Sequence, residues 1–133
     1  MNGTLLLIIL VGAGIFFALR RVLPHPISQE LSTKLLKEHP LILDVRTDAE
    51  YRNEHISKSV HIPLAELKSK IQRHAPDKNQ VILLYCASGA RSAVGQTILE
   101  KLGYSRSYNL GSISRARFLL SVHPSDPGTS EGR

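Results

Sequence analysis

The chain has 133 residues, of which 42% are hydrophobic and 21% charged, and its formal net charge is +6. This length accommodates one domain of about 100 residues with short segments at its ends, and the apolar content excludes wholesale disorder. The 17 lysines and arginines are scattered along a chain with few aromatic residues, so no nucleic-acid partner is expected, and the single cysteine excludes an internal disulfide bond.

The first segment, residues 1–23, has the pattern of a membrane anchor. Residues 3–19 contain no charged side chain and would span about 25 Å as a helix, against a hydrocarbon core of about 30 Å. Arg20 and Arg21 follow the apolar run, whereas a cleaved signal peptide carries its positive charge before it. We therefore expect one transmembrane helix of a single-pass protein in a bacterial inner membrane, with the C-terminal domain on the cytoplasmic side.

Helical and strand patterns alternate from residue 27 onward. The expected elements, in chain order, are a helix over 28–39, a strand over 41–45, a short helix or turn over 47–56, a strand over 59–63, a helix over 64–74, a strand over 81–86, a helix over 91–102 and a strand over 107–110. Strands separated by helices predict the α/β class, with a parallel sheet covered by helices on both faces. The strand over 81–86 is the most apolar, which predicts that it lies at the centre of the sheet.

Two boundaries follow from composition. We expect a folded domain over residues 24–122 and a disordered tail over residues 123–133, because the tail is rich in proline, glycine and serine. No nucleotide-binding loop or metal-spaced cluster is present, so no cofactor and no metal are expected. His55 and His61 are six residues apart, a spacing that favours structural roles over metal binding.

The stretch "LLYCASGARSAVGQ" contains the only cysteine, Cys86, between the most apolar strand and a helix. Open α/β sheets bind ligands at this kind of strand-to-helix turn. Small residues there leave backbone amides uncovered, and a helix N-terminus adds partial positive charge that stabilises a thiolate. The loop that we expect to bind an anionic substrate consists of Ala87, Ser88, Gly89, Ala90 and Arg91.

This pattern predicts nucleophilic attack by the Cys86 thiolate on an anion, with a covalent intermediate held by backbone amides. Cysteine phosphatases place five residues between cysteine and arginine, whereas four separate Cys86 from Arg91. The shorter loop favours a sulfur atom over a phosphate group, and phosphatase or arsenate chemistry stays open as an alternative hypothesis.

Several motifs resemble those of single-domain members of the rhodanese family, over roughly residues 26–117. They occur in the family's order as "LILDVRTDAEYRNEHI", "SKSVHIPLAEL", "YCASGARSA" and "LGYSRSYNLGSI". The resemblance implies a rhodanese-like fold in which Cys86 forms a persulfide and residues 87–91 cradle it. It also implies that Asp44, Arg46, Glu50 and His55 organise the sheet edge near the site through hydrogen bonds and an ion pair.

The chain departs from the family pattern at two places. Glu54 and Lys58 stand where the family usually has glycines, and His61 stands where it has asparagine, so we expect a remodelled turn. The usual glycine pair and later tryptophan are replaced by "GSISRAR", which alters the C-terminal edge of the site.

The sequence thus predicts a membrane-tethered sulfurtransferase. A small anion such as thiosulfate would donate sulfane sulfur to Cys86, and a thiol, cyanide or partner protein would accept it. The alternative is a non-turnover sulfur-carrier or docking module, whose membrane anchor would raise its concentration beside a partner.

Overall fold

The computed structural model describes residues 2–22 and 24–122, and for residues 19–22 it describes the backbone. In chain order the elements are α1 (Gly3–Val22), α2 (Gln29–Leu36), β1 (Leu41–Asp44), α3 (Asp48–Asn53), β2 (Val60–His61), η1 (Leu64–Glu66), α4 (Leu67–His74), β3 (Ile82–Cys86), α5 (Ala90–Lys101), β4 (Ser107–Ser112) and α6 (Ile113–Ser121). The tail predicted over residues 123–133 lies outside the described part of the chain.

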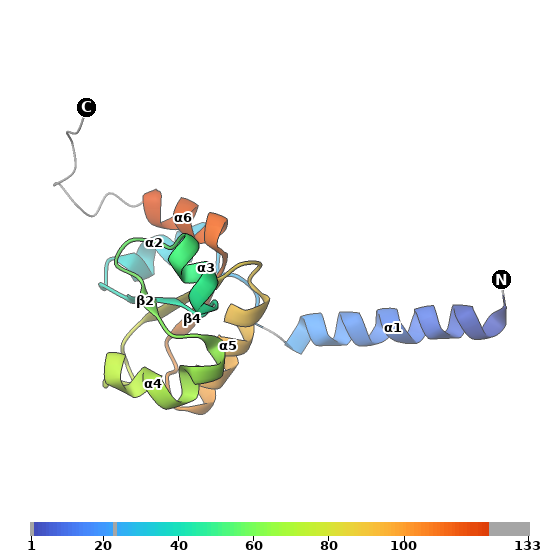
Figure 1. Ribbon diagram of the computed structural model, residues 1–133. Helices are drawn as coiled ribbons and strands as arrows, with labels where there is room; N and C mark the ends of the chain where they lie inside the picture. Colours follow the sequence, from blue (N-terminus) through green and yellow to red (C-terminus); the bar gives the residue numbers. More distant parts are fainter. Residues whose placement is uncertain (1, 23, 123–133) are drawn as a thin grey trace.

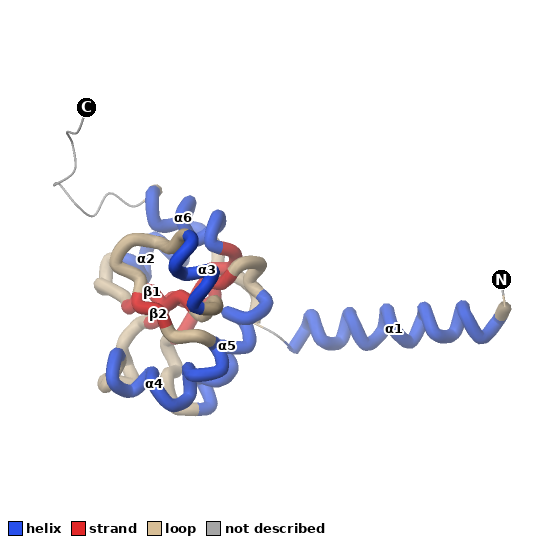
Figure 2. Tube along the Cα trace, in the orientation of Figure 1, coloured by secondary structure: helices blue, strands red, loops and turns tan. Residues whose placement is uncertain are grey.

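The strands form one parallel sheet in the order β2-β1-β3-β4. The predicted parallel sheet is confirmed, and β3 lies inside it between β1 and β4, as its apolar sequence predicts. The strands, drawn in red, lie between the helices of the domain (Figure 2). Because all strands run in the same direction, their carboxyl ends meet at one edge of the sheet. Cys86, the last residue of β3, lies at that edge.

Helices cover both faces of the sheet (Figure 1). Ile82, Leu84 and Cys86 of β3 pack in one cluster with side chains of α4 and α5, whereas Leu83 and Tyr85 pack on the opposite face with side chains of α2 and α6. All five residues of β3 are buried. This two-sided burial explains why the strand reads as an uninterrupted apolar run.

Helix α6 was not predicted from the sequence, and β4 extends two residues beyond the predicted strand. The helix begins directly after β4, where the Ser112 hydroxyl accepts a hydrogen bond from the Arg115 backbone N–H. Its apolar face buries Ile113, Ala116 and Leu119 against the sheet. The "GSISRAR" stretch therefore contains an N-cap and the start of a helix.

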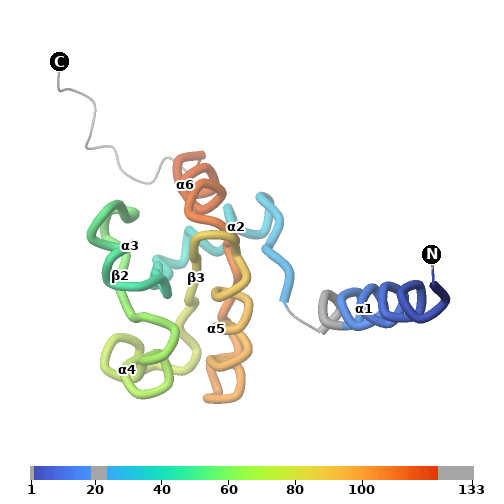
Figure 3. Tube along the Cα trace, turned by 45° about the vertical axis from the view of Figure 1, so that its right-hand side comes forward, coloured from blue at the N-terminus to red at the C-terminus, as the bar shows by residue number. Residues whose placement is uncertain are grey.

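The N-terminal helix α1 extends away from the domain (Figures 1 and 3). The transmembrane span predicted for residues 1–23 is not supported, because no helix within the described residues is both long and apolar enough to cross a membrane.

The linker after α1 is attached to the last strand of the sheet. The Ile27 backbone N–H donates to the Asn109 carbonyl at 2.9 Å, and the Asn109 side-chain amide donates to the Pro24 carbonyl at 3.4 Å. The Arg115 guanidinium also donates to the Ile27 carbonyl. The linker therefore belongs to the folded domain and lies beside β4.

The turn before β2 contains both positions at which the family usually has glycine. Lys58 has φ 64°, a left-handed conformation that favours glycine. Glu54 has φ −159°, an extended conformation open to any residue, and its carboxylate pairs with Arg117 at 2.9 Å. Of the two substitutions, only Lys58 therefore places a side chain in a conformation that disfavours it.

We predict that Lys58→Gly raises the free energy of unfolding by about 0.5–1 kcal/mol, because it relieves the left-handed conformation. Glu54→Gly is the matched control and should lower it by a similar amount, since glycine there only adds freedom to the unfolded chain and removes the ion pair. Urea unfolding followed by circular dichroism measures both variants. A Lys58→Gly variant less stable than the wild type would contradict this account of the turn.

Candidate active site

Cys86 ends β3, and α5 begins four residues later at Ala90. The cysteine is free and has no exposed surface. Ala87, Ser88 and Ala90 are exposed, so the small side chains predicted to bind substrate form the outer part of the loop. The sulfur atom lies beneath them at the carboxyl edge of the sheet.

Gly89 gives the loop its tight curl. It precedes α5 with φ +96°, a conformation that side chains rarely adopt. A Cβ atom at this position would lie 3.1 Å from the Gly111 Cα of β4. Conformation and close packing therefore both require glycine here.

The curl directs hydrogen-bond donors at the sulfur atom. The Gly89 backbone N–H donates to Cys86 Sγ at 3.0 Å. Burial by itself would raise the pKa of the Cys86 thiol, but hydrogen bonds from the Ser92 hydroxyl and from the backbone amides of Ser92, Gly89 and Ser88 outweigh it and lower the pKa. The site therefore favours the thiolate, which is the nucleophilic form of cysteine.

Two site residues, Ser92 and Asn109, were not predicted from the sequence. Ser92 Oγ lies 3.5 Å from Cys86 Sγ and 2.7 Å from Asn109 Oδ1, and both polar side chains are buried. A β-bulge between β3 and β4 pairs Leu84 with Asn109 but Tyr85 with Gly111. The sequence signal was a polar residue in the first turn of the helix and another inside an apolar strand.

Arg91 makes a bidentate ion pair with Glu50 of α3. Its two terminal nitrogens donate to the two Glu50 carboxylate oxygens, each at 2.7 Å. Glu50 also accepts hydrogen bonds from the backbone N–H and hydroxyl of Thr47 at the start of α3. The Arg91 guanidinium, followed by the Thr47 amide, holds the pKa of the Glu50 carboxyl far below its usual range. The cation predicted to bind substrate is therefore already neutralised by a carboxylate.

Asp44 and Arg46 form the buried ion pair at the end of β1 that the resemblance implies. The Arg46 Nη2 atom donates to Asp44 Oδ2 at 2.7 Å and to the Glu54 carbonyl at 2.6 Å. Both side chains are almost fully buried. The pair therefore connects the end of β1 to the segment that follows α3, which is a structural role.

The two histidines flank the ring of Tyr51. His55 and His61 stack on it with ring centroids 4.0 and 4.3 Å away. His55 Nδ1 contacts the Tyr51 carbonyl at 2.9 Å, and His61 Nε2 contacts the Arg46 carbonyl at 2.8 Å. These contacts agree with the structural roles predicted for both residues.

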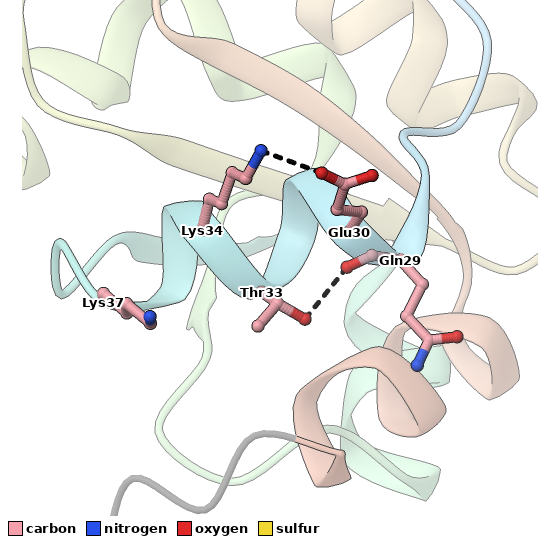
Figure 4. Close-up of a pocket in the computed structure, with 5 residues that line it drawn as sticks. All are labelled: Gln29, Glu30, Thr33, Lys34 and Lys37. Atoms are coloured by element: carbon pink, nitrogen blue, oxygen red, sulfur yellow. Dashed lines mark hydrogen bonds and ion pairs between the residues drawn. The ribbon is translucent and has the colours of Figure 1, made fainter.

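A hollow lies on the outside of α2 (Figure 4). It is lined by Gln29, Glu30, Thr33, Lys34 and Lys37. Lys34 pairs with Glu30 within the same helix at 2.9 Å, and both side chains are mostly exposed. The hollow contains no residue of the Cys86 loop.

Among the described residues, no group of three or more histidine, cysteine, aspartate or glutamate side chains could hold a metal ion.

Comparisons with known proteins agree with this geometry. Residues 28–115 match the Rhodanese-like domain family. Thiosulfate sulfurtransferase PspE of Escherichia coli (strain K12) is 37% identical over 71 residues, which cover 53% of this chain and 68% of that protein. A sulfurtransferase of Allochromatium vinosum is 35% identical over 98 residues, which cover 71% of this chain and 90% of the relative.

A solved structure described as a rhodanese with anions from E. coli aligns with a TM-score of 0.56 and 34% identity, covering 57% of this chain and 89% of that one. The family match over residues 28–115 spans all four strands, the Cys86 loop and the helices from α2 to α5. The chain therefore belongs to the rhodanese family, and it is a sulfurtransferase.

Proposed function

We propose that Cys86 takes sulfane sulfur from thiosulfate or a similar small anion and passes it to a thiol, cyanide or protein acceptor. The observation that carries this proposal is the hydrogen bond of 3.0 Å that the Gly89 backbone N–H donates to the buried Cys86 Sγ. A relative that is 37% identical is named a thiosulfate sulfurtransferase, which supports thiosulfate as the donor.

The reaction has two half-reactions. In the first, the Cys86 thiolate attacks the outer sulfur of thiosulfate, a new S–S bond forms, and the old S–S bond breaks with its electron pair leaving on sulfite. In the second, the acceptor attacks the outer sulfur of the persulfide, and the Cys86 thiolate leaves with the electron pair. Each step exchanges one nucleophile for another at the transferred sulfur, so no external oxidant is needed.

The Ser92 hydroxyl and backbone amides, rather than a free cation, stabilise charge at the sulfur. The N–H groups of Ser88, Gly89 and Ser92 converge on Cys86, while Arg91 is occupied by Glu50. A phosphatase would need its loop arginine available to a phosphate group, so this pairing favours sulfur transfer over the phosphatase hypothesis.

Sulfur transfer should depend on the Cys86 sulfur atom. Cys86→Ala and Cys86→Ser should abolish thiocyanate formation from thiosulfate and cyanide, because each removes the atom that carries the sulfur. The measurement uses the full chain in detergent, with circular dichroism to establish that each variant is folded. Turnover by Cys86→Ala would contradict the proposal, and a folded wild type without turnover would favour the sulfur-carrier module.

Binding of the donor should depend on the pairing of Arg91 with Glu50. Glu50→Gln should lower the KM for thiosulfate about fivefold, since releasing a partly exposed guanidinium from its partner is worth on the order of 1 kcal/mol to an anion beside it. Glu54→Gln is the matched control, because it also breaks an arginine pair, with Arg117, at a similar exposure. An increased or unchanged KM in Glu50→Gln would show that Arg91 does not meet the donor.

We also propose that α1 holds the domain at the cytoplasmic face of a membrane. Large apolar side chains from Leu5 to Phe17 are between 46% and 67% exposed, and an exposed apolar surface of this extent is typical of a lipid- or protein-binding element. The sequence places Arg20 and Arg21 on the domain side of this apolar run, which supports the cytoplasmic orientation.

Flotation of the full chain with phosphatidylcholine vesicles tests this tether. The wild type should float, and Ile8→Lys should reduce flotation, because a lysine in the bilayer interior costs about 2.5–3.5 kcal/mol. Leu31→Lys, at an exposed apolar position of α2, is the control and should float like the wild type. A wild type that stays in the aqueous fraction would contradict the tether.

A further inference from the structure

The Ser92 hydroxyl lies between the sulfur nucleophile and a buried amide. It has three acceptors within reach: Asn109 Oδ1 at 2.7 Å, the Gly89 carbonyl at 3.1 Å and Cys86 Sγ at 3.5 Å. A hydroxyl has one proton to donate and two lone pairs that accept. Ser92 is fully buried, so its hydrogen bond is shared among these protein atoms.

The neighbours of Asn109 fix the orientation of its amide. Its nitrogen donates to the Gly89 carbonyl at 3.2 Å and to the Pro24 carbonyl at 3.4 Å, and its oxygen accepts the Gly111 backbone N–H at 2.8 Å. The amide oxygen must therefore face Ser92 as an acceptor. This oxygen remains satisfied by Gly111 when the Ser92 proton turns elsewhere.

We propose that Ser92 is a catalytic residue whose hydroxyl reverses its hydrogen bond with Cys86 as the charge on the sulfur changes. When Cys86 is a thiol, its S–H donates to Ser92 Oγ, and the Ser92 hydroxyl donates to Asn109. When the thiol loses its proton to solvent, the hydroxyl turns from Asn109 and donates to the thiolate. No covalent bond of Ser92 changes.

This reversal matters at two points of the proposed sulfur transfer, on which the inference rests. It stabilises the thiolate before attack on the donor, and it stabilises the same thiolate as the leaving group when the acceptor removes the sulfur. In the persulfide the negative charge lies on the outer sulfur, so the hydroxyl returns to Asn109. Ser92 thereby favours the charged Sγ over the sulfur-loaded form.

The charged groups near Cys86 occur in opposite-sign pairs. Arg91 of α5 is paired with Glu50 of α3, and Arg46 is paired with Asp44 at the end of β1. From β4 the neutral Asn109 approaches through Ser92, and Tyr85 packs on the opposite face of the sheet. A side-chain hydroxyl is therefore well placed to respond to charge on the sulfur.

The test is the pH dependence of Cys86 alkylation by iodoacetamide, using the full chain in detergent. Ser92→Ala should raise the midpoint by about one pH unit, so that alkylation below both midpoints is about tenfold slower. Ser107→Ala is the matched control, because Ser107 is also buried and its hydroxyl donates to the Tyr104 carbonyl. Its midpoint should equal that of the wild type.

A Ser92→Ala midpoint equal to that of the wild type would overturn the inference. Alkylation needs the thiolate but no sulfur donor, so this result is independent of whether the enzyme transfers sulfur. If Ser92→Ala fails to fold, the infrared S–H stretch of the wild type provides the test. The chain has one cysteine, so any S–H band belongs to Cys86. A band at lower wavenumber than that of a simple thiol in an apolar solvent supports the S–H to Ser92 bond, and a band at the same wavenumber overturns it.

Discussion

The hydrogen bond from the Gly89 amide to the Cys86 sulfur is the interaction on which the site depends. It requires the left-handed conformation of Gly89, and it requires the close approach of this residue to Gly111 of β4. Both conditions hold because β3 and β4 are adjacent parallel strands that end at the same edge. The fold thus provides a cluster of amide dipoles at a point where a buried thiol would otherwise resist ionisation.

Much of the fold could be predicted from the distribution of apolar residues. The buried strand β3 is an uninterrupted apolar run, and α4 has apolar residues at helical spacing. Helix α6 was missed because it starts at the residue after β4, without an intervening loop of turn residues. The anchor prediction for residues 1–23 rested on an apolar run followed by two arginines, whereas no helix within the described residues is both long and apolar enough to cross a membrane.

The proposed nucleophile and its loop could be located because they are contiguous in the sequence, between a strand and a helix. The resemblance placed Glu50 near the site, but the contacts that Arg91 and Ser92 make could not be predicted, since they depend on tertiary structure. Glu50 reaches Arg91 across 41 residues, and Asn109 reaches Ser92 across 17. The β-bulge that places Asn109 has no signal in hydrophobic periodicity.

The central claim is that Cys86 carries the transferred sulfur, and intact-mass spectrometry of the full chain tests it most directly. After incubation with thiosulfate and removal of excess donor, the wild type should gain the mass of one sulfur atom, lose it on treatment with dithiothreitol, and show no gain as Cys86→Ala. A folded wild type that gains no mass, or a Cys86→Ala variant that gains the same mass, would contradict the account.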